Sequence, residues 1–372
     1  MSIITDRFKK DKKEKKSPAI TQKNIEESRE EILANGKKFR YPFQYAKHRL
    51  VINTIAIAVV ALVAFLAVGW LQVYKVQSTS DVVYRFANFL RLPVAEIDGH
   101  KVRYSDYLMI FRSSIATIEY QSGKFDDSED SKSQINHYKR QAMNAAEDYT
   151  YALAKMEELG LEVTDEEIDA VIEEHKTING ERRSDEVFET IVKENFGFSI
   201  KDYRRFIMLS LAKRKVAEAV DTDAKDLIAE VKTKLAANQG DMATLATEYA
   251  NSNIFSYEKT DTMVSVNNLD GGRAAKAYEL EKAGDISDVF ISKNGDGFYI
   301  VKLVAKSDNK VNYESIWVRF SRLNSDLQQV RNDGKVKEYI KIEESESNAD
   351  DVNLEENAEP EAVEAPEAPT GE

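Results

Sequence analysis

The longest apolar run of the chain lies between Val51 and Tyr74, where 24 residues carry no charged side chain. A helix of this length reaches about 36 Å at 1.5 Å per residue, enough to cross a hydrocarbon core of about 30 Å. The pattern therefore predicts a single transmembrane helix over residues 50–75. Because the run contains no Asp, Glu, Lys, Arg or His, it is expected to be an anchor and not a pore or a proton relay.

Two other interpretations of this run, a signal peptide and a buried core helix, fit the sequence less well. A cleavable signal peptide has an apolar region of about 7–15 residues behind a short basic segment. Here the apolar run is longer, about 50 residues precede it, and the following KVQSTSDVV offers no convincing cleavage site. A buried core helix is also disfavoured, since helices of soluble domains usually keep a polar face.

Beyond the apolar run, the spacing of hydrophobic positions indicates a helical bundle. The segment AEIDGHKVRY predicts a short hairpin that turns at Asp98 and Gly99. Apolar residues then recur every three or four positions between capping signals, among them a capping box of Thr164 and Glu167. They predict helices at about 105–121, 133–159, 165–176, 185–196, 200–220 and, after the polar joint Asp221–Asp223, at 224–238.

Charge is distributed unevenly along the chain, whose net charge is −13. Residues 1–49 hold 14 Lys and Arg against 7 Asp and Glu, so the positive-inside rule places the N-terminus in the cytoplasm and everything after the helix outside. The basic segment is expected to contact anionic lipid headgroups or to fix the topology. In this segment Phe39–Arg49 interleaves aromatic and basic residues; it is either an interfacial anchor or a plain linker. The acidic balance elsewhere argues against a nucleic-acid-binding protein.

The C-terminal segment is predicted to be disordered, and the cysteine count excludes several kinds of chemistry. Residues 343–372 are acidic, rich in Pro and Ala, and nearly free of large apolar groups, so they are expected to be disordered. The chain contains no cysteine, which excludes disulfides, thiol catalysis and cysteine-based zinc sites.

Several motifs occur in an order that resembles a known family. The hairpin VAEIDGHKV, the tripeptide Ser105–Tyr107 and the helical segment Gly197–Lys213 resemble the N-terminal chaperone domain of SurA-type and PrsA-type foldases. Three later segments resemble the parvulin domain that follows it in those families: GDMATLATEY, AYELEKAGDIS and GFYIVKL. The resemblance covers about residues 82–305. It implies a chaperone domain and a peptidyl-prolyl isomerase domain.

The second domain departs from the family where the resemblance implies catalysis. Parvulin-type isomerases line their pocket with two histidines on adjacent central strands, but this chain has no histidine after residue 220. Tyr299 stands where the last-strand histidine is expected. The first family strand is missing at its usual place, and the alternating segment Val311–Phe320 would put Ser315 at its histidine position. We interpret the domain as circularly permuted, with this later strand filling the empty place beside the last family strand; the alternative is an ordinary edge hairpin.

No other site type is supported by the sequence. Glu173, Glu174 and His175 lack a further ligand histidine, so they indicate a solvated helical face. No Walker loop, dinucleotide loop or nucleophile motif is present. We therefore expect no catalytic residue, no metal and no cofactor, and we name Tyr299 and Ser315 as weak candidates for the parvulin-like pocket. Eight methionines and aromatics of the bundle could either contact a client or pack in the core, and the sequence does not decide between these roles. They are Met109, Met143, Met156, Met208, Tyr107, Phe111, Tyr203 and Phe206.

Together these patterns predict a mainly α protein with a small α+β domain. Its expected parts are a basic cytoplasmic segment (1–49), a transmembrane signal-anchor (50–75), a helical chaperone domain (82–221), a degenerate parvulin-like domain of antiparallel sheet and helices (222–342) and an acidic tail (343–372). Three functions stay open: a membrane-anchored extracytoplasmic holdase for unfolded exported proteins, an active parvulin-type isomerase, and an envelope scaffold. The expected location is a bacterial cytoplasmic membrane.

Overall fold

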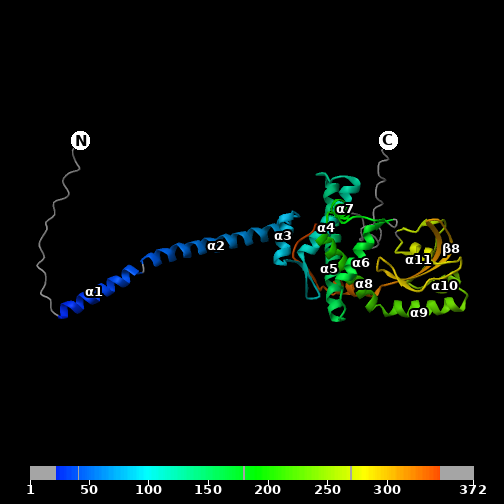
Figure 1. Cartoon of the computed structure of the whole chain (residues 1–372). Coiled ribbons are helices and arrows are strands. Elements are labelled where there is room, and N and C mark those ends of the chain that lie inside the picture. Colours follow the sequence, from blue (N-terminus) through cyan, green and yellow to red (C-terminus); the bar gives the residue numbers. More distant parts are fainter. Residues whose placement is uncertain (1–21, 41, 179–180, 269, 344–372) are drawn as a thin grey trace. The chain divides into compact units, whose positions relative to one another are not determined.

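The computed structural model describes residues 22–40, 42–178, 181–268 and 270–343 (Figure 1). Its contacts divide the chain into two compact units, Met1–Trp70 and Leu71–Glu372. The start of the basic segment and the acidic tail beyond Glu343 lie outside the described residues. The predictions made for those two ends therefore remain predictions.

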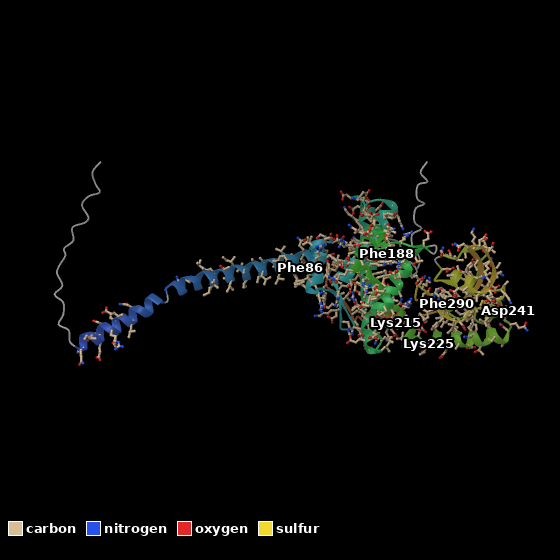
Figure 2. All side chains as sticks on the ribbon, in the orientation of Figure 1. Phe86, Phe188, Lys215, Lys225, Asp241 and Phe290 are labelled. Atoms are coloured by element: carbon tan, nitrogen blue, oxygen red, sulfur yellow. The ribbon has the colours of Figure 1, made fainter. Side chains whose placement is uncertain are left out.

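The first unit is helical where the structure describes it. It contains α1 (Gln22–Arg40) and most of α2 (Pro42–Tyr74), a helix of 33 residues. Pro42 occupies the first helical position, where its missing N–H leaves no hydrogen bond unmade. Within the described part of the chain, one helix is long and apolar enough to span a membrane, over Arg49–Tyr74. Its apolar side chains are exposed as far as Leu71 (Figure 2), which contradicts the core-helix alternative.

The last turn of α2 belongs to the second unit. Val73 is fully buried there, and its carbonyl oxygen accepts a hydrogen bond from the Tyr104 hydroxyl at 3.0 Å. The Tyr74 hydroxyl donates to the carbonyl oxygen of Pro93 at 2.7 Å. These two hydrogen bonds join the end of α2 to the folded unit.

The first half of the second unit is a helical bundle with a small sheet. The predicted hairpin is present: Asp98 and Gly99 both have positive φ, 47° and 85°, as a tight two-residue turn requires. Its strands are β1 (Pro93–Ile97) and β2 (His100–Arg103). The helices are α3 (Asp81–Leu90), α4 (Tyr104–Ser122), α5 (Glu129–Glu158), α6 (Asp165–Lys176), α7 (Asp185–Phe196) and α8 (Ile200–Val220), with a two-residue pairing of β3 (Thr177–Ile178) and β4 (Glu181–Arg182) after α6.

Capping explains where these helices start. Thr164 and Glu167 form the predicted capping box of α6, and Ser184 and Ser199 cap α7 and α8. Ser128 caps α5, which therefore begins four residues earlier than the predicted Ser133. The bundle residues that the sequence leaves open between client contact and core are all buried or partly buried, and Phe111 also lines a groove. The most buried are Met109, Met143, Tyr107, Phe111, Tyr203 and Phe206, while Met156 and Met208 are partly buried.

The second half is an antiparallel sheet covered on both faces. Its strand order is β5-β9-β8-β7, with β6 also paired to β9. On one face, α9 and α10 pack against Phe298, Ile300 and Ile316; on the other, α11 packs against Val301 and Leu303 (Figure 1). The elements are α9 (Thr222–Ala237), α10 (Met242–Glu248), β5 (Phe255–Lys259), β6 (Val264–Ser265), α11 (Arg273–Glu279), β7 (Phe290–Ile291), β8 (Gly297–Ser307) and β9 (Lys310–Arg319).

The strand predicted from the alternation of Val311–Phe320 forms as β9. It follows β8 through a hairpin and pairs with it along its whole length, while β5 pairs with its other edge. The prediction that this strand lies beside the last family strand is confirmed. A central place for β9 also argues against an edge hairpin and supports a circular permutation.

The chain then returns to the helical half, which sequence patterns did not indicate. Helix α12 (Arg322–Asn332) contacts α8, and β10 (Val336–Glu338) adds a third strand beside β1. The Arg331 guanidinium donates to Asp148 at 2.6 Å, and Ile340 and Ile342 are buried in the core. Residues 321–342 were grouped with the parvulin-like domain on sequence, but their contacts are with the helical bundle.

A buried carboxylate lies under this returning segment. Glu147 of α5 is 2% exposed, and one of its oxygens lacks a hydrogen-bond partner in the described structure. Burial raises its pKa from an ordinary 4.5 to about 7, although Arg331 favours the charged form. The folded state therefore binds more protons than the unfolded state between these two values, and stability falls as pH rises through that window.

We expect Glu147→Gln to stabilise the protein at pH 8 by about 2 kcal/mol, since it removes a charge that is costly to bury. Below pH 5 the variant and the parent should be equally stable. Denaturant unfolding at both pH values measures this. The comparison is Asp148→Asn on the same helix, which weakens the short pair with Arg331 and should destabilise at pH 8. If Glu147→Gln lowers the stability at pH 8, the buried Glu147 charge does not destabilise the folded state.

Candidate functional site

The β8–β9 register gathers the two predicted pocket residues on one face of the sheet. Tyr299 pairs with Trp317, and Val301 pairs with Ser315. Side chains alternate along a strand, so Tyr299, Ser315 and Trp317 all project from the face that α11 covers. The sequence assigned the first two to this pocket, and the structure adds Trp317 to them.

Aromatic rings run across three strands on this face. The Tyr299 ring stacks between Phe290 of β7, with ring centroids 5.9 Å apart, and Trp317 of β9, at 5.8 Å. The Arg319 guanidinium lies 4.4 Å from the Trp317 ring centroid. Stacked rings and an overlying cation contribute beyond simple burial. The ladder of Phe290, Tyr299 and Trp317 therefore fills the face where the family places its pocket.

Arg273, the first residue of α11, ties the ladder to its polar neighbours. Its guanidinium lies 5.1 Å from the Tyr299 ring centroid and 3.4 Å from the Ser315 hydroxyl. It also forms an ion pair with Glu258 of β5. Arg273 was not among the candidate residues selected from the sequence. Its position directly after Gly271-Gly272 was the one available signal.

Both predicted pocket residues are closed off from solvent. Tyr299 is 3% exposed and Ser315 is 1% exposed. Burial, and then the nearby Asp296 carboxylate, raise the pKa of the Tyr299 phenol above its ordinary 10.0. The phenol is therefore neutral at physiological pH and offers neither a base nor a nucleophile. A proline ring would have to displace the packed ladder to reach it.

The histidines of the second unit lie on other elements. His100 is on β2, His137 on α5 and His175 on α6, where its Nδ1 lies 2.7 Å from the Tyr203 hydroxyl. Among the residues that the structure describes, no three His, Asp or Glu side chains converge as a metal site would require. The sheet face thus offers packing and charge pairing, with no acid–base pair of the parvulin kind.

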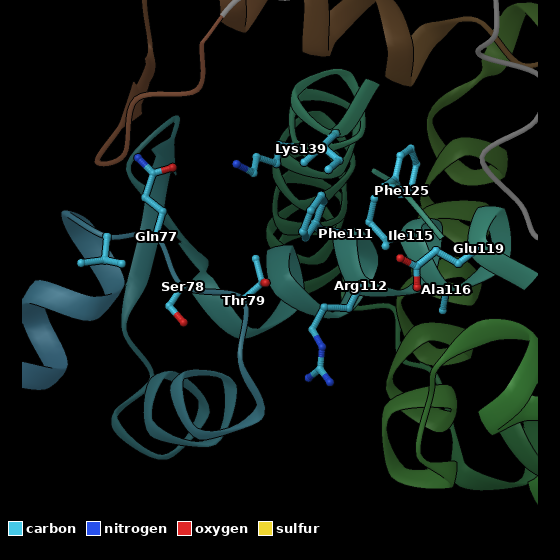
Figure 3. Close-up of a pocket in the computed structure, with 12 residues that line it drawn as sticks. Gln77, Ser78, Thr79, Phe111, Arg112, Ile115, Ala116, Glu119, Phe125 and Lys139 are labelled. Atoms are coloured by element: carbon cyan, nitrogen blue, oxygen red, sulfur yellow. The ribbon is translucent and has the colours of Figure 1, made fainter. Parts of the chain in front are cut away.

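A second candidate site is an open groove in the helical half, of about 620 Å³ (Figure 3). Phe111 and Ile115 of α4, Phe125 of the following loop and Ile135 of α5 give it an apolar floor. Gln77 and Lys139 lie at one side of the groove, and Glu119 lies at the other. The segment Val76–Thr79, which directly follows α2, forms its wall. The groove is therefore next to the end of the apolar helix.

Comparison with known families gives two matches, which together run from the first unit into the sheet of the second. Residues 43–217 match the model of the SurA-like N-terminal domain, and residues 207–305 match the PPIC-type PPIase domain. No curated protein matches the chain significantly. The PPIase match stops before β9, so the central strand of the sheet comes from sequence outside the family model.

Fold, groove and family matches define a protein with a SurA-like chaperone domain followed by a parvulin domain. The chain has the architecture of the SurA/PrsA-type foldases, a family of protein-folding factors.

Proposed function

We propose that the chain is a membrane-anchored extracytoplasmic chaperone that holds unfolded exported proteins in the groove of its helical half. The groove carries the proposal: an apolar floor suits the aliphatic and aromatic segments that an unfolded chain exposes, and charged side chains stand at its margin. Its wall follows α2 directly, so an anchored protein would present the groove close to the membrane surface. Tethering of this kind raises the effective concentration of a binder near emerging clients.

The parvulin-like domain is proposed to be non-catalytic. Isomerisation requires a pocket that receives the proline and stabilises a twisted amide. Here the face is filled by Phe290, Tyr299 and Trp317, and Arg273 is held over Tyr299 by its pair with Glu258. Such a face supports a structural role in joining the sheet to α11.

The test measures client holding and isomerisation in one preparation of the full chain in nanodiscs. We expect Phe125→Asp to raise the concentration needed to suppress aggregation of an unfolded client about tenfold. The reason is that an aromatic contact of roughly 1.5–3 kcal/mol is lost. Phe125 is on a loop and outside the core clusters, so the fold should persist, as circular dichroism will show.

Tyr120→Asp is the matched control, because Tyr120 is 47% exposed on α4 and does not line the groove. If both substitutions weaken holding equally, the groove is not the client site. Acceleration of proline isomerisation by the purified chain, abolished by Tyr299→Ala, would establish an active isomerase instead. Selective binding of one folded partner with no effect on unfolded clients would favour the envelope scaffold.

A further inference from the structure

The described chain ends at the margin of the groove. The Gln77 side-chain amide, which lines the groove, donates to the carbonyl oxygen of Lys341 at 3.0 Å. Lys139, also in the lining, is close enough to Glu343 for their charges to interact. The buried side chains of Ile340 and Ile342 hold this end in place. Residues 344–372 therefore start beside the groove.

The composition of residues 344–372 complements the groove. They carry 11 Asp and Glu and no Lys or Arg. Lys139 and Arg112, the latter paired with Asp81, line the groove together with one carboxylate, Glu119, and Lys75 and Lys124 adjoin lining residues in sequence. Charge pairing would steer the acidic segment towards this margin.

One short stretch of the tail also fits the apolar floor. Val352 and Leu354 are the first large aliphatic residues after the described chain, and acidic residues flank them on both sides in DDVNLEE. In an extended conformation, residues two apart project to the same side. Nine residues beyond Glu343 reach up to about 30 Å, so this stretch needs no unfolding of the described chain to enter the groove.

We infer that the acidic tail binds the groove of its own helical half, with Val352 and Leu354 on the apolar floor and the flanking carboxylates at the cationic margin. Because the tail is tethered, its effective concentration there is in the millimolar range, so weak contacts suffice for occupancy. The tail then competes with clients, and a client with a longer apolar segment displaces it. This competition rests on the proposed function; the binding of the tail does not.

The absence of native cysteine makes a direct test available. Thr79→Cys in the groove wall is combined with Leu354→Cys in the full chain in nanodiscs, and disulfide formation under mild oxidation is followed on non-reducing gels. We expect a monomeric cross-linked band that forms at least tenfold faster than in Ala229→Cys with Leu354→Cys. Ala229 is an exposed position on α9 that lines no part of the groove. Phe125→Asp should slow the first cross-link and leave the second unchanged.

Equal cross-linking rates for the two pairs would overturn the inference, as would bands found only at the mass of two chains. In the second arm, a chain that stops after Glu343 should suppress aggregation of the unfolded client at a several-fold lower chain concentration than the full chain needs. If the shortened chain and the full chain suppress aggregation equally well, the tail does not compete with clients for the groove. Selective cross-linking without any client holding would sustain tail binding and refute the proposed function, so the two failures are distinguishable.

Discussion

Replacing Gly297 by alanine is expected to destabilise the second unit by at least about 3 kcal/mol. A Cβ atom added there would stand 2.3 Å from the carbonyl oxygen of Val318 and 2.5 Å from Nε1 of Trp317. The first neighbour is backbone of the central strand β9, and the second belongs to the packed aromatic ladder, so neither yields without breaking the β8–β9 pairing. Denaturant unfolding of the full chain measures the loss.

Trp317 reports on this region directly. The chain has two tryptophans, so a Trp70→Phe background leaves Trp317 as the sole tryptophan, and its fluorescence reports on the substituted position. Gly334→Ala is the control: Gly334 has φ of 68° but nothing within 4 Å of an added Cβ. That change should cost only the backbone strain of roughly 1–2 kcal/mol. Comparable losses for the two variants would show that crowding at Gly297 does not govern stability.

The sequence predicted those parts of the fold that local chemistry determines. The hairpin at Asp98-Gly99, the capping box of α6 and the apolar run of α2 each depend on residues close together in the chain. The placement of β9 was also predictable, because its alternating pattern follows the last family strand after a short loop. The start of α5 was misplaced because Ser128 caps it ahead of a polar stretch, whereas α3 was missed although Ser80 caps it and apolar residues follow.

The candidate sites were less accessible from the sequence. Tyr299 and Ser315 were selected through the family resemblance and lie on one face of the sheet, but Arg273, which lies close to both, comes from a different element. The groove combines a loop after α2 with residues of α4 and α5, so no single stretch reveals it. The return of α12 and β10 to the bundle depends on long-range contacts such as Arg331 with Asp148.

Asp221 also makes long-range contacts, although the sequence indicates only that it belongs to a polar joint. It is 1% exposed, and one carboxylate oxygen accepts from the backbone N–H of Ala224 at 3.0 Å, which caps α9. The other oxygen accepts from the N–H groups of Ser321 and Arg322, at 2.6 and 2.9 Å, where α12 begins. One buried carboxylate thus serves two helix N-termini at the point where the chain leaves the sheet for the bundle.

We expect Asp221→Ala to destabilise the second unit by about 3–5 kcal/mol, because three N–H groups at two helix starts lose a buried acceptor. Asp221→Asn should cost less, since its single oxygen still satisfies one helix. The matched control is Asp241→Ala, which removes the exposed cap of α10 at Thr244 and should cost about 1 kcal/mol. Denaturant unfolding ranks the three variants. If Asp221→Ala costs no more than Asp241→Ala, the carboxylate does not couple the sheet to the bundle, and the returning α12 must be held by its contacts with α5 and α8 alone.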